Sequence, residues 1–153
     1  MPNLVAATAE SAAVPATMGT ILEVNSPANR KATITEFSIS FSGISPTDIP
    51  VLVQTVEVTA TSAVGTAVTP SSQRNGQIIT GGATAKKLPA TEGTVIVLKT
   101  YMVPPSSGLV IQYPQGREPE IQGAAATAKG FAIRANRGAG AAINTNINVE
   151  WEE

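Results

Sequence analysis

The sequence predicts an all-β protein, a sandwich or barrel of seven to eight short strands. Apolar and polar residues alternate with a period of two, most plainly in the run INTNINVEW from Ile143 to Trp151. Gly, Pro, Asn and Ser separate such segments at short intervals. Helical candidates are confined to 83–87 and 124–128. Both fall below the roughly 12–15 residues that an isolated helix needs, so we expect turns or a single helical turn there.

With 153 residues the chain has the length of one domain. The first fifteen residues, MPNLVAATAESAAVP, have no Lys or Arg before their apolar stretch, and Thr8, Glu10 and Ser11 interrupt it. A secretion signal needs a basic start and an unbroken apolar run. A flexible or partner-bound arm over 1–15 is therefore favoured, followed by a β-domain over 16–153.

The predicted strands are named here in chain order. A short strand at Thr20–Val24 ends before Pro27, and a short piece near Glu118–Ile121 is expected to pair as well. The main strands are expected at Ile34–Phe41, Val51–Val58, Thr94–Val103, Leu109–Tyr113, Phe131–Asn136 and Ile143–Trp151.

Two predicted strands, Val51–Val58 and Thr94–Val103, are nearly apolar on both faces. One small core cannot cover both faces of each, so we expect a neighbouring subunit to cover the remainder. The spacing of Thr94–Val103 and Leu109–Tyr113 around Ser106-Ser-Gly108 is typical of a hairpin. The predicted core consists of Phe37, Ile39, Phe41, Ile96, Leu98, Phe131, Ile133, Ile147 and Val149.

The segment 60–93 is expected to be a long loop. Thr, Ala, Ser and Gly dominate it, and Asn75-Gly76 is a turn signal followed by a short expected strand at Gln77–Thr80. Loops of this length in compact domains are usually functional or disordered. We expect this loop, like the arm, to be mobile in solution and to become ordered against a neighbour.

The composition disfavours catalysis. The chain has no Cys and no His, and Asp48 is its only aspartate. Cysteine nucleophiles, disulfides and the commonest general base are therefore absent. Glu118 and Glu120 share one strand face, but Arg117 beside them favours a solvated ionic patch over a catalytic or metal-binding pair. We expect no enzyme activity, no cofactor and no stoichiometric metal.

Three further signals have a structural interpretation that is favoured over a binding one. The net charge of −1 disfavours nucleic-acid and anionic-membrane partners. The Gly138-x-Gly140 pair lies between two predicted strands, whereas a phosphate cradle needs a helix start next. Tyr101 and Tyr113 are expected to be neighbours, for packing rather than carbohydrate binding.

The strand and turn choices resemble those of small tailed-phage virion proteins. The resemblance extends from about Ala28 to the chain end and is carried by Ile34–Gly43, TEGT at 91–94, YMVP at 101–104, YPQGRE at 113–118, GFAIR at 130–134 and VEWEE at 149–153. These proteins are similar to jelly-roll capsid decoration, or cement, proteins. The resemblance implies a jelly-roll-like β-sandwich of antiparallel strands.

It further implies a structural virion protein that is made in the host cytoplasm, binds the major capsid protein on the outer capsid surface and stabilises the shell. The expected assembly is a homo-oligomer, with a trimer favoured. The alternative is a carbohydrate- or host-surface-binding β-sandwich of a phage tail, fibre or head spike. The residues expected to bind partners come from the arm and the long loop: Leu4, Val5, Val14, Thr66, Val68, Lys86 and Lys87.

Overall fold

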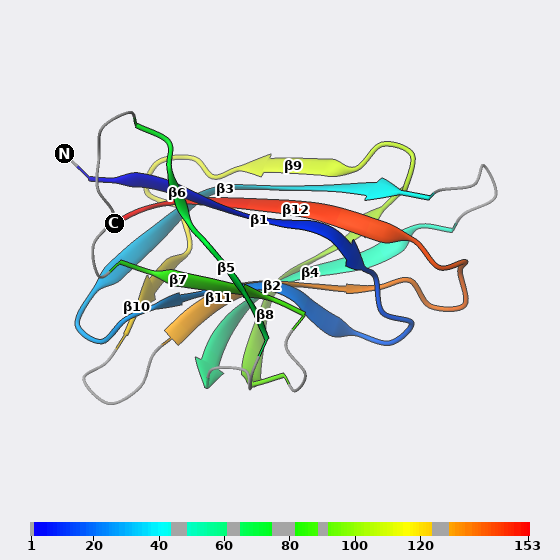
Figure 1. Ribbon diagram of the computed structural model, residues 1–153, viewed down its shortest axis with the longest axis horizontal. Helices are drawn as coiled ribbons and strands as arrows, with labels where there is room; N and C mark the ends of the chain where they lie inside the picture. The colour runs from blue at the N-terminus through cyan, green and yellow to red at the C-terminus, as the bar shows by residue number, and fades with distance from the viewer. Residues whose placement is uncertain (1, 44–48, 61–64, 75–81, 89–91, 124–128) are drawn as a thin grey trace.

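The computed structural model describes residues 2–43, 49–60, 65–74, 82–88, 92–123 and 129–153. These residues form twelve strands and no helix, arranged as two stacked sheets (Figure 1). The strands are β1 (Leu4–Ala13), β2 (Gly19–Ser26), β3 (Lys31–Ser42), β4 (Val51–Ala60), β5 (Thr66–Val68), β6 (Ser71–Ser72), β7 (Thr84–Lys87), β8 (Thr94–Val103), β9 (Leu109–Gln112), β10 (Glu120–Gln122), β11 (Lys129–Asn136) and β12 (Asn144–Glu152). The predicted all-β sandwich is confirmed.

The two sheets are built from antiparallel strand pairs. Sheet A has the order β10-β3-β12-β1-β6, with β9 beside β3 as well, and sheet B has the order β5-β7-β2-β11-β4-β8. The first four strands alternate between the sheets, and most of the later connections also cross from one layer to the other. The chain ends pair with each other, because Asn3 N donates to Glu153 O at 2.9 Å and Glu153 N donates to Asn3 O at 3.1 Å.

The strand pairing is nested. The first long strand pairs with the last, β1 with β12, and the second with the last but one, β2 with β11. Inside these, β3 pairs with β9 and β10, and β4 pairs with β8. Each of these pairs joins segments that lie far apart in the sequence.

The core lies between the two sheets and is filled by the alternate side chains that the period-two pattern selects. Trp151, Phe37 and Phe131 are its largest fully buried residues. Of the predicted core residues, Phe37, Ile39, Phe131, Ile133, Ile147 and Val149 are confirmed as buried, and Phe41 packs partly buried against them. A second, small cluster of Val56, Val58 and Ala132 lies apart from this core on sheet B.

The predicted N-terminal arm is wrong. Residues 4–13 form β1, which lies between β12 and β6 inside sheet A. Val5, Ala7 and Ala9 are buried in the core on alternate positions. Alanine has little strand preference and little apolar contrast with Thr, so the period-two signal was weak, and burial rather than propensity places this strand.

The predicted loop 60–93 also contains strands that the sequence did not indicate. Within its described part lie β5, β6 and β7, and β7 occupies the segment where a turn or a helical turn was expected. Each has only two to four residues, too short to display a period. The expected strand at 77–80 and the helical candidate at 124–128 lie outside the described residues.

The predicted hairpin between 94–103 and 109–113 is wrong as well. β8 pairs with β4 in sheet B, while β9 pairs with β3 in sheet A. The turn between them passes from one sheet to the other. Gly108 serves this turn with a φ of 65°, and an added Cβ would lie 2.5 Å from Ile39 O. Glycine alone fits both conditions.

Candidate functional site

The structure separates the residues that the sequence analysis assigned to partner binding. Val5 and Val14 are 0% and 3% exposed and belong to the core, so their assignment is wrong. Leu4 is partly buried at the start of β1. Thr66 and Val68 pair with β7 at the edge of sheet B, where Thr66 lies opposite Lys87. The four residues from the loop therefore share one edge.

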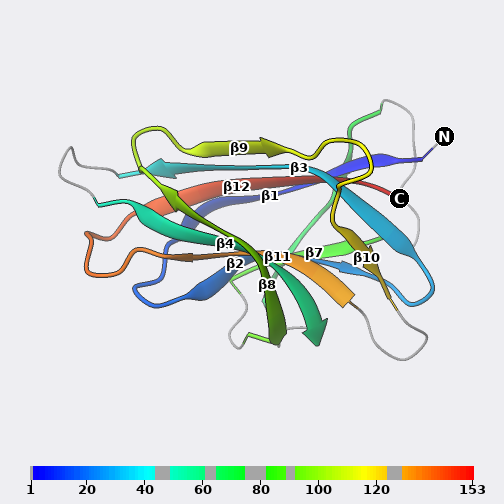
Figure 2. The ribbon, with the colours of Figure 1, turned by 180° about the vertical axis from the view of Figure 1, so that it is seen from behind.

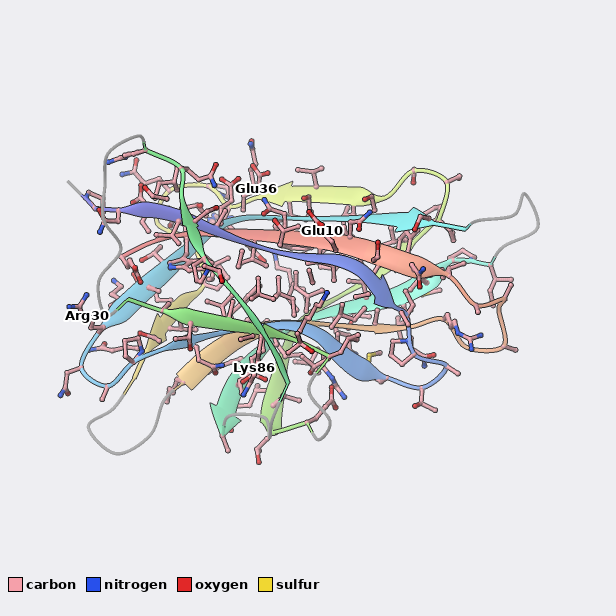
Figure 3. The ribbon with its side chains drawn as sticks, viewed as in Figure 1. Glu10, Arg30, Glu36 and Lys86 are labelled. Atoms are coloured by element: carbon pink, nitrogen blue, oxygen red, sulfur yellow. The ribbon has the colours of Figure 1, made fainter. Side chains whose placement is uncertain are left out.

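Lys86 contacts a carboxylate inside its own sheet. Glu23 on β2 is 0% exposed, and Lys86 lies directly opposite it in register. Lys86 Nζ is 3.7 Å from Glu23 Oε1, and the lysine side chain is only 20% exposed. Figure 3 labels Lys86 on β7. A lysine that neutralises a buried carboxylate has a role in the fold, and its assignment as a partner-binding residue stays a prediction.

Lys87 contributes to the closure of the sandwich. Its Nζ donates to the backbone carbonyl of Glu10 on β1, at 3.3 Å, and so links sheet B to sheet A. Figure 3 labels Glu10 on β1, above the strand that carries these lysines. Of the predicted partner-binding residues at this edge, Thr66 is exposed, whereas Val68, Lys86 and Lys87 are partly buried.

The opposite edge of sheet B presents apolar side chains to solvent. β8 has ten residues and pairs along one side only, with β4. Its exposed apolar residues are Ile96 at 53%, Val97 at 47%, Leu98 at 43% and Met102 at 62%. We call these four residues the β8 edge. Ile96 and Leu98 were predicted to be core residues, and that prediction is wrong because no second layer covers them.

A cavity of 320 Å³ opens beside the β8 edge. We call it the side cavity. Its apolar lining comes from Leu98 of β8, Tyr113 and Pro119 after β9, Ile121 of β10 and Phe131 of β11. Both sheets therefore contribute to one concave site. Figure 2 shows β8 at the front of the molecule and β10 on the same side, across from it.

Leu98 and Lys99 both line the side cavity although they are consecutive in a strand. The register of β8 on β4 shifts there: Lys99 lies opposite Thr55 and Val97 lies opposite Val56, so Leu98 is an extra residue. A bulge of this kind re-aims side chains that would otherwise alternate. The sequence carries no local signal of this bulge.

Two hydroxyl groups lie in the side cavity. Thr55 is 0% exposed, and its Oγ1 lies beside the Tyr113 hydroxyl. Burial, and secondarily the neighbouring Tyr101, raises the pKa of Tyr113 to about 12, although the nearby Thr55 hydroxyl favours the phenolate. Tyr113 thus carries its proton at any physiological pH. Tyr101 and Tyr113 both pack on Phe37, with ring centroids 6.0 and 6.3 Å from it, as the packing interpretation predicted.

Charged groups surround the mouth of the side cavity. Glu57 is paired with Lys129 at 3.4 Å, and Glu120 is paired with Lys31. Lys99 and Arg117 also line the site and have no carboxylate partner among the described residues.

The other chemical candidates have structural roles. The pair of Glu118 and Glu120 is not isolated, because Glu120 is bound to Lys31 across β10 and β3. The Gly138-x-Gly140 segment is a turn between β11 and β12, closed by Gly140 N donating to Arg137 O at 3.1 Å. Among the described residues, no group of acidic, His or Cys side chains has the arrangement to hold a metal ion.

Taken together, the fold and its surface define a β-sandwich with one closed side and one open side that carries an apolar edge strand and a cavity. Across the described part of the chain, no helix has the length and hydropathy to cross a membrane. Searches of protein-family models, curated proteins and solved structures found no match to this chain.

Proposed function

We propose that the protein is a structural virion component that binds the outer surface of a phage capsid and stabilises the shell. The nested strand pairing supports a jelly-roll topology, in which eight strands form two Greek keys in two sheets. That topology agrees with the resemblance to decoration proteins, and jelly rolls are common in viral capsid proteins.

The β8 edge is the observation that carries the proposal. An exposed, long, apolar edge strand offers a row of unpaired backbone groups and is a site of association unless something covers it. Ile96, Val97 and Leu98 extend this surface over consecutive residues. A protein that functions by assembling requires such a surface.

The occupant that we propose for this edge is another copy of the chain. β8 carries one charge, Lys99, in ten residues. Antiparallel pairing of two copies about Val97 places Leu98 opposite Ile96 and Lys99 opposite Val95 of the other copy. Apolar side chains then meet each other, and the two lysines do not face one another. This contact is self-complementary, as a two-fold interface requires. The trimer expected from the resemblance would instead need a head-to-tail contact.

Assembly explains how a weak contact with the shell becomes a strong one. When one contact of an oligomer is bound, the next forms at a high effective concentration, so avidity exceeds single-site affinity by about 10²–10⁴. Many bound copies that span joints between capsid subunits then add interface area to the shell.

The test is co-sedimentation of the purified protein with bare capsids, combined with sedimentation velocity of the free protein. Val97→Lys is expected to give a monomer and to lower the capsid affinity at least tenfold. Val110→Lys, on exposed β9 of the other sheet, is the matched control and should change neither property. Sedimentation velocity of the unmodified protein also distinguishes a dimer from the trimer.

Failure of the wild-type protein to bind any bare capsid would overturn the decoration function. Binding to host cells under the same conditions, without binding to capsids, would establish the alternative, a host-surface-binding module. A Val97→Lys variant that assembles like the wild type would remove the β8 edge from the subunit interface.

A further inference from the structure

The side cavity has the size and depth of a ligand site. Its 320 Å³ lies at the small end of the range of about 300–1,000 Å³ for pockets that hold small molecules. Phe131, Ile121 and Leu98 provide apolar surface from three strands in two sheets. The site is therefore held by the rigid part of the fold, apart from the segment that carries Tyr113, Arg117 and Pro119.

The hydroxyl groups inside the cavity favour a ligand that carries hydroxyl groups. A buried polar atom without a partner is costly and rare in folded proteins. Thr55 Oγ1 lines the cavity, and its neighbour there is the Tyr113 hydroxyl. The Tyr113 hydroxyl lies close to it and remains protonated. Beyond their mutual contact, each hydroxyl can form a further hydrogen bond, which a purely apolar ligand would leave unused and a ligand hydroxyl would supply.

The charged side chains at the opening of the cavity favour a ligand that also carries an anionic group. The two lining carboxylates, Glu57 and Glu120, are each neutralised by a lysine. Lys99 and Arg117 add two positive charges that no carboxylate balances among the described residues. Arginine binds a carboxylate through two parallel hydrogen bonds. The paired glutamates still accept hydrogen bonds from ligand hydroxyls.

We propose that the side cavity binds an acidic monosaccharide unit, a sugar ring that carries a carboxylate. The ring presents an apolar face to Phe131 and Leu98, and its hydroxyls bond to Thr55, Tyr113 and the glutamates. Its carboxylate binds Arg117 and Lys99. A neutral sugar makes no use of the two cations, and inorganic phosphate makes no use of the apolar wall. This proposal is independent of the capsid-binding function.

The test is a titration of the full ¹⁵N-labelled chain with sodium glucuronate, followed by NMR. Glucose, a neutral ring with the same ring hydroxyls, and sodium acetate, the carboxylate without the ring, are the matched ligands. Glucuronate is expected to shift the amides around Thr55, Leu98 and Phe131 and to bind at least tenfold more tightly than either control ligand. Its affinity should fall as the salt concentration rises.

Two variants assign the contacts. Arg117→Gln is expected to lower glucuronate affinity about tenfold and to leave glucose affinity unchanged. Thr55→Val replaces the hydroxyl by a methyl group of similar size, so it should weaken the binding of both sugars. Arg30→Gln, an exposed arginine in the β2–β3 turn that does not line the cavity, is the control and should bind like the wild type. Its position is labelled in Figure 3.

Acetate binding as tight as glucuronate would overturn the proposal, because the cavity would then be a general anion site. Glucose binding as tight as glucuronate would also overturn it, because the cations would then not select the ligand. Absence of saturable shifts with all three ligands would do the same. Methyl glucuronide distinguishes two sources that both support the proposal: binding equal to glucuronate indicates a chain-terminal residue, and its loss indicates the free sugar.

Discussion

The two edges of sheet B differ in length, polarity and cover. At one edge lie the short strands β5 and β7, with three and four residues. From β5 the chain crosses to β6, which pairs with β1 in sheet A and closes that side of the sandwich (Figure 1). At the other edge, β8 presents ten residues, and the side cavity lies beside Leu98 and Lys99 of this strand. Short strands and a crossing segment protect the first edge, whereas the second requires a partner.

Removal of β1 breaks the closed side most completely. Deletion of residues 1–15 takes away the strand between β12 and β6 and exposes the inner face where Val5, Ala7 and Ala9 pack. We expect the truncated protein to lose its cooperative thermal transition, measured by circular dichroism and calorimetry. Glu10→Gln, a change on the exposed side of the same strand, is the control and should melt like the wild type. A truncated protein that keeps a native transition would show instead that residues 1–15 are an arm that the fold does not need.

The next largest expected effect is the loss of the buried ion pair between Lys86 and Glu23, on the closed side of sheet B. Lys86→Met leaves the fully buried Glu23 carboxylate without its lysine, and removing one partner of a buried pair costs about 3 kcal/mol. Chemical denaturation measures the change in the free energy of unfolding. Lys87→Met, which removes only a hydrogen bond to the Glu10 carbonyl, should cost about 1 kcal/mol. Equal losses in the two variants would contradict the assigned role of Glu23.

The third prediction concerns Gly108, in the turn that leads from β8 to β9 on the open side of the sandwich. Gly108→Ala combines a positive φ with a Cβ placed 2.5 Å from Ile39 O, so we expect a loss of about 2 kcal/mol. Gly116→Ala has a similar φ of 82° but open space around the added Cβ, so it should lose about 1 kcal/mol. The difference between the two melting curves isolates the steric contact. Identical losses would show that backbone strain alone explains both.

The smallest effect is pH-dependent and concerns the segment that leads into β8. Glu92 accepts hydrogen bonds from Thr20 Oγ1 at 2.7 Å and from Arg134 Nη2 at 2.7 Å. Burial raises the pKa of Glu92, but the hydrogen bonds from Arg134 and Thr20 and the charge of Arg134 outweigh it, so the pKa lies below its usual value of 4.5.

Because the folded pKa is lowered, Glu92 contributes stability above pH 4.5 that is lost as the pH falls through the folded pKa. Glu92→Gln should lower the free energy of unfolding by about 1 kcal/mol at neutral pH and flatten its fall below pH 4.5. Urea titrations from pH 7 to pH 3 measure both. Glu10→Gln, which lies outside this ion pair, should retain the wild-type pH profile. A Glu92→Gln profile that parallels the wild type would remove this ion pair from the acid dependence.

The sequence alone determined which segments with strong polar contrast are strands. In β3 and β12 the alternation of large apolar and polar residues matches burial closely, as for Phe37 and Trp151. Alternation with a period of two requires no knowledge of the partner strand, because successive side chains of any strand point to opposite faces.

Only the tertiary structure determined which strands pair with one another and which strand lies at an edge. Ala-rich β1 became an internal strand and apolar β8 became an edge, although hydrophobicity ranks them in the opposite order. The side cavity depends on the same decision, since its lining comes from four strands and a connection that are distant in the sequence. Pairing between distant strands depends on packing across two sheets, a property of the whole chain that no single segment encodes.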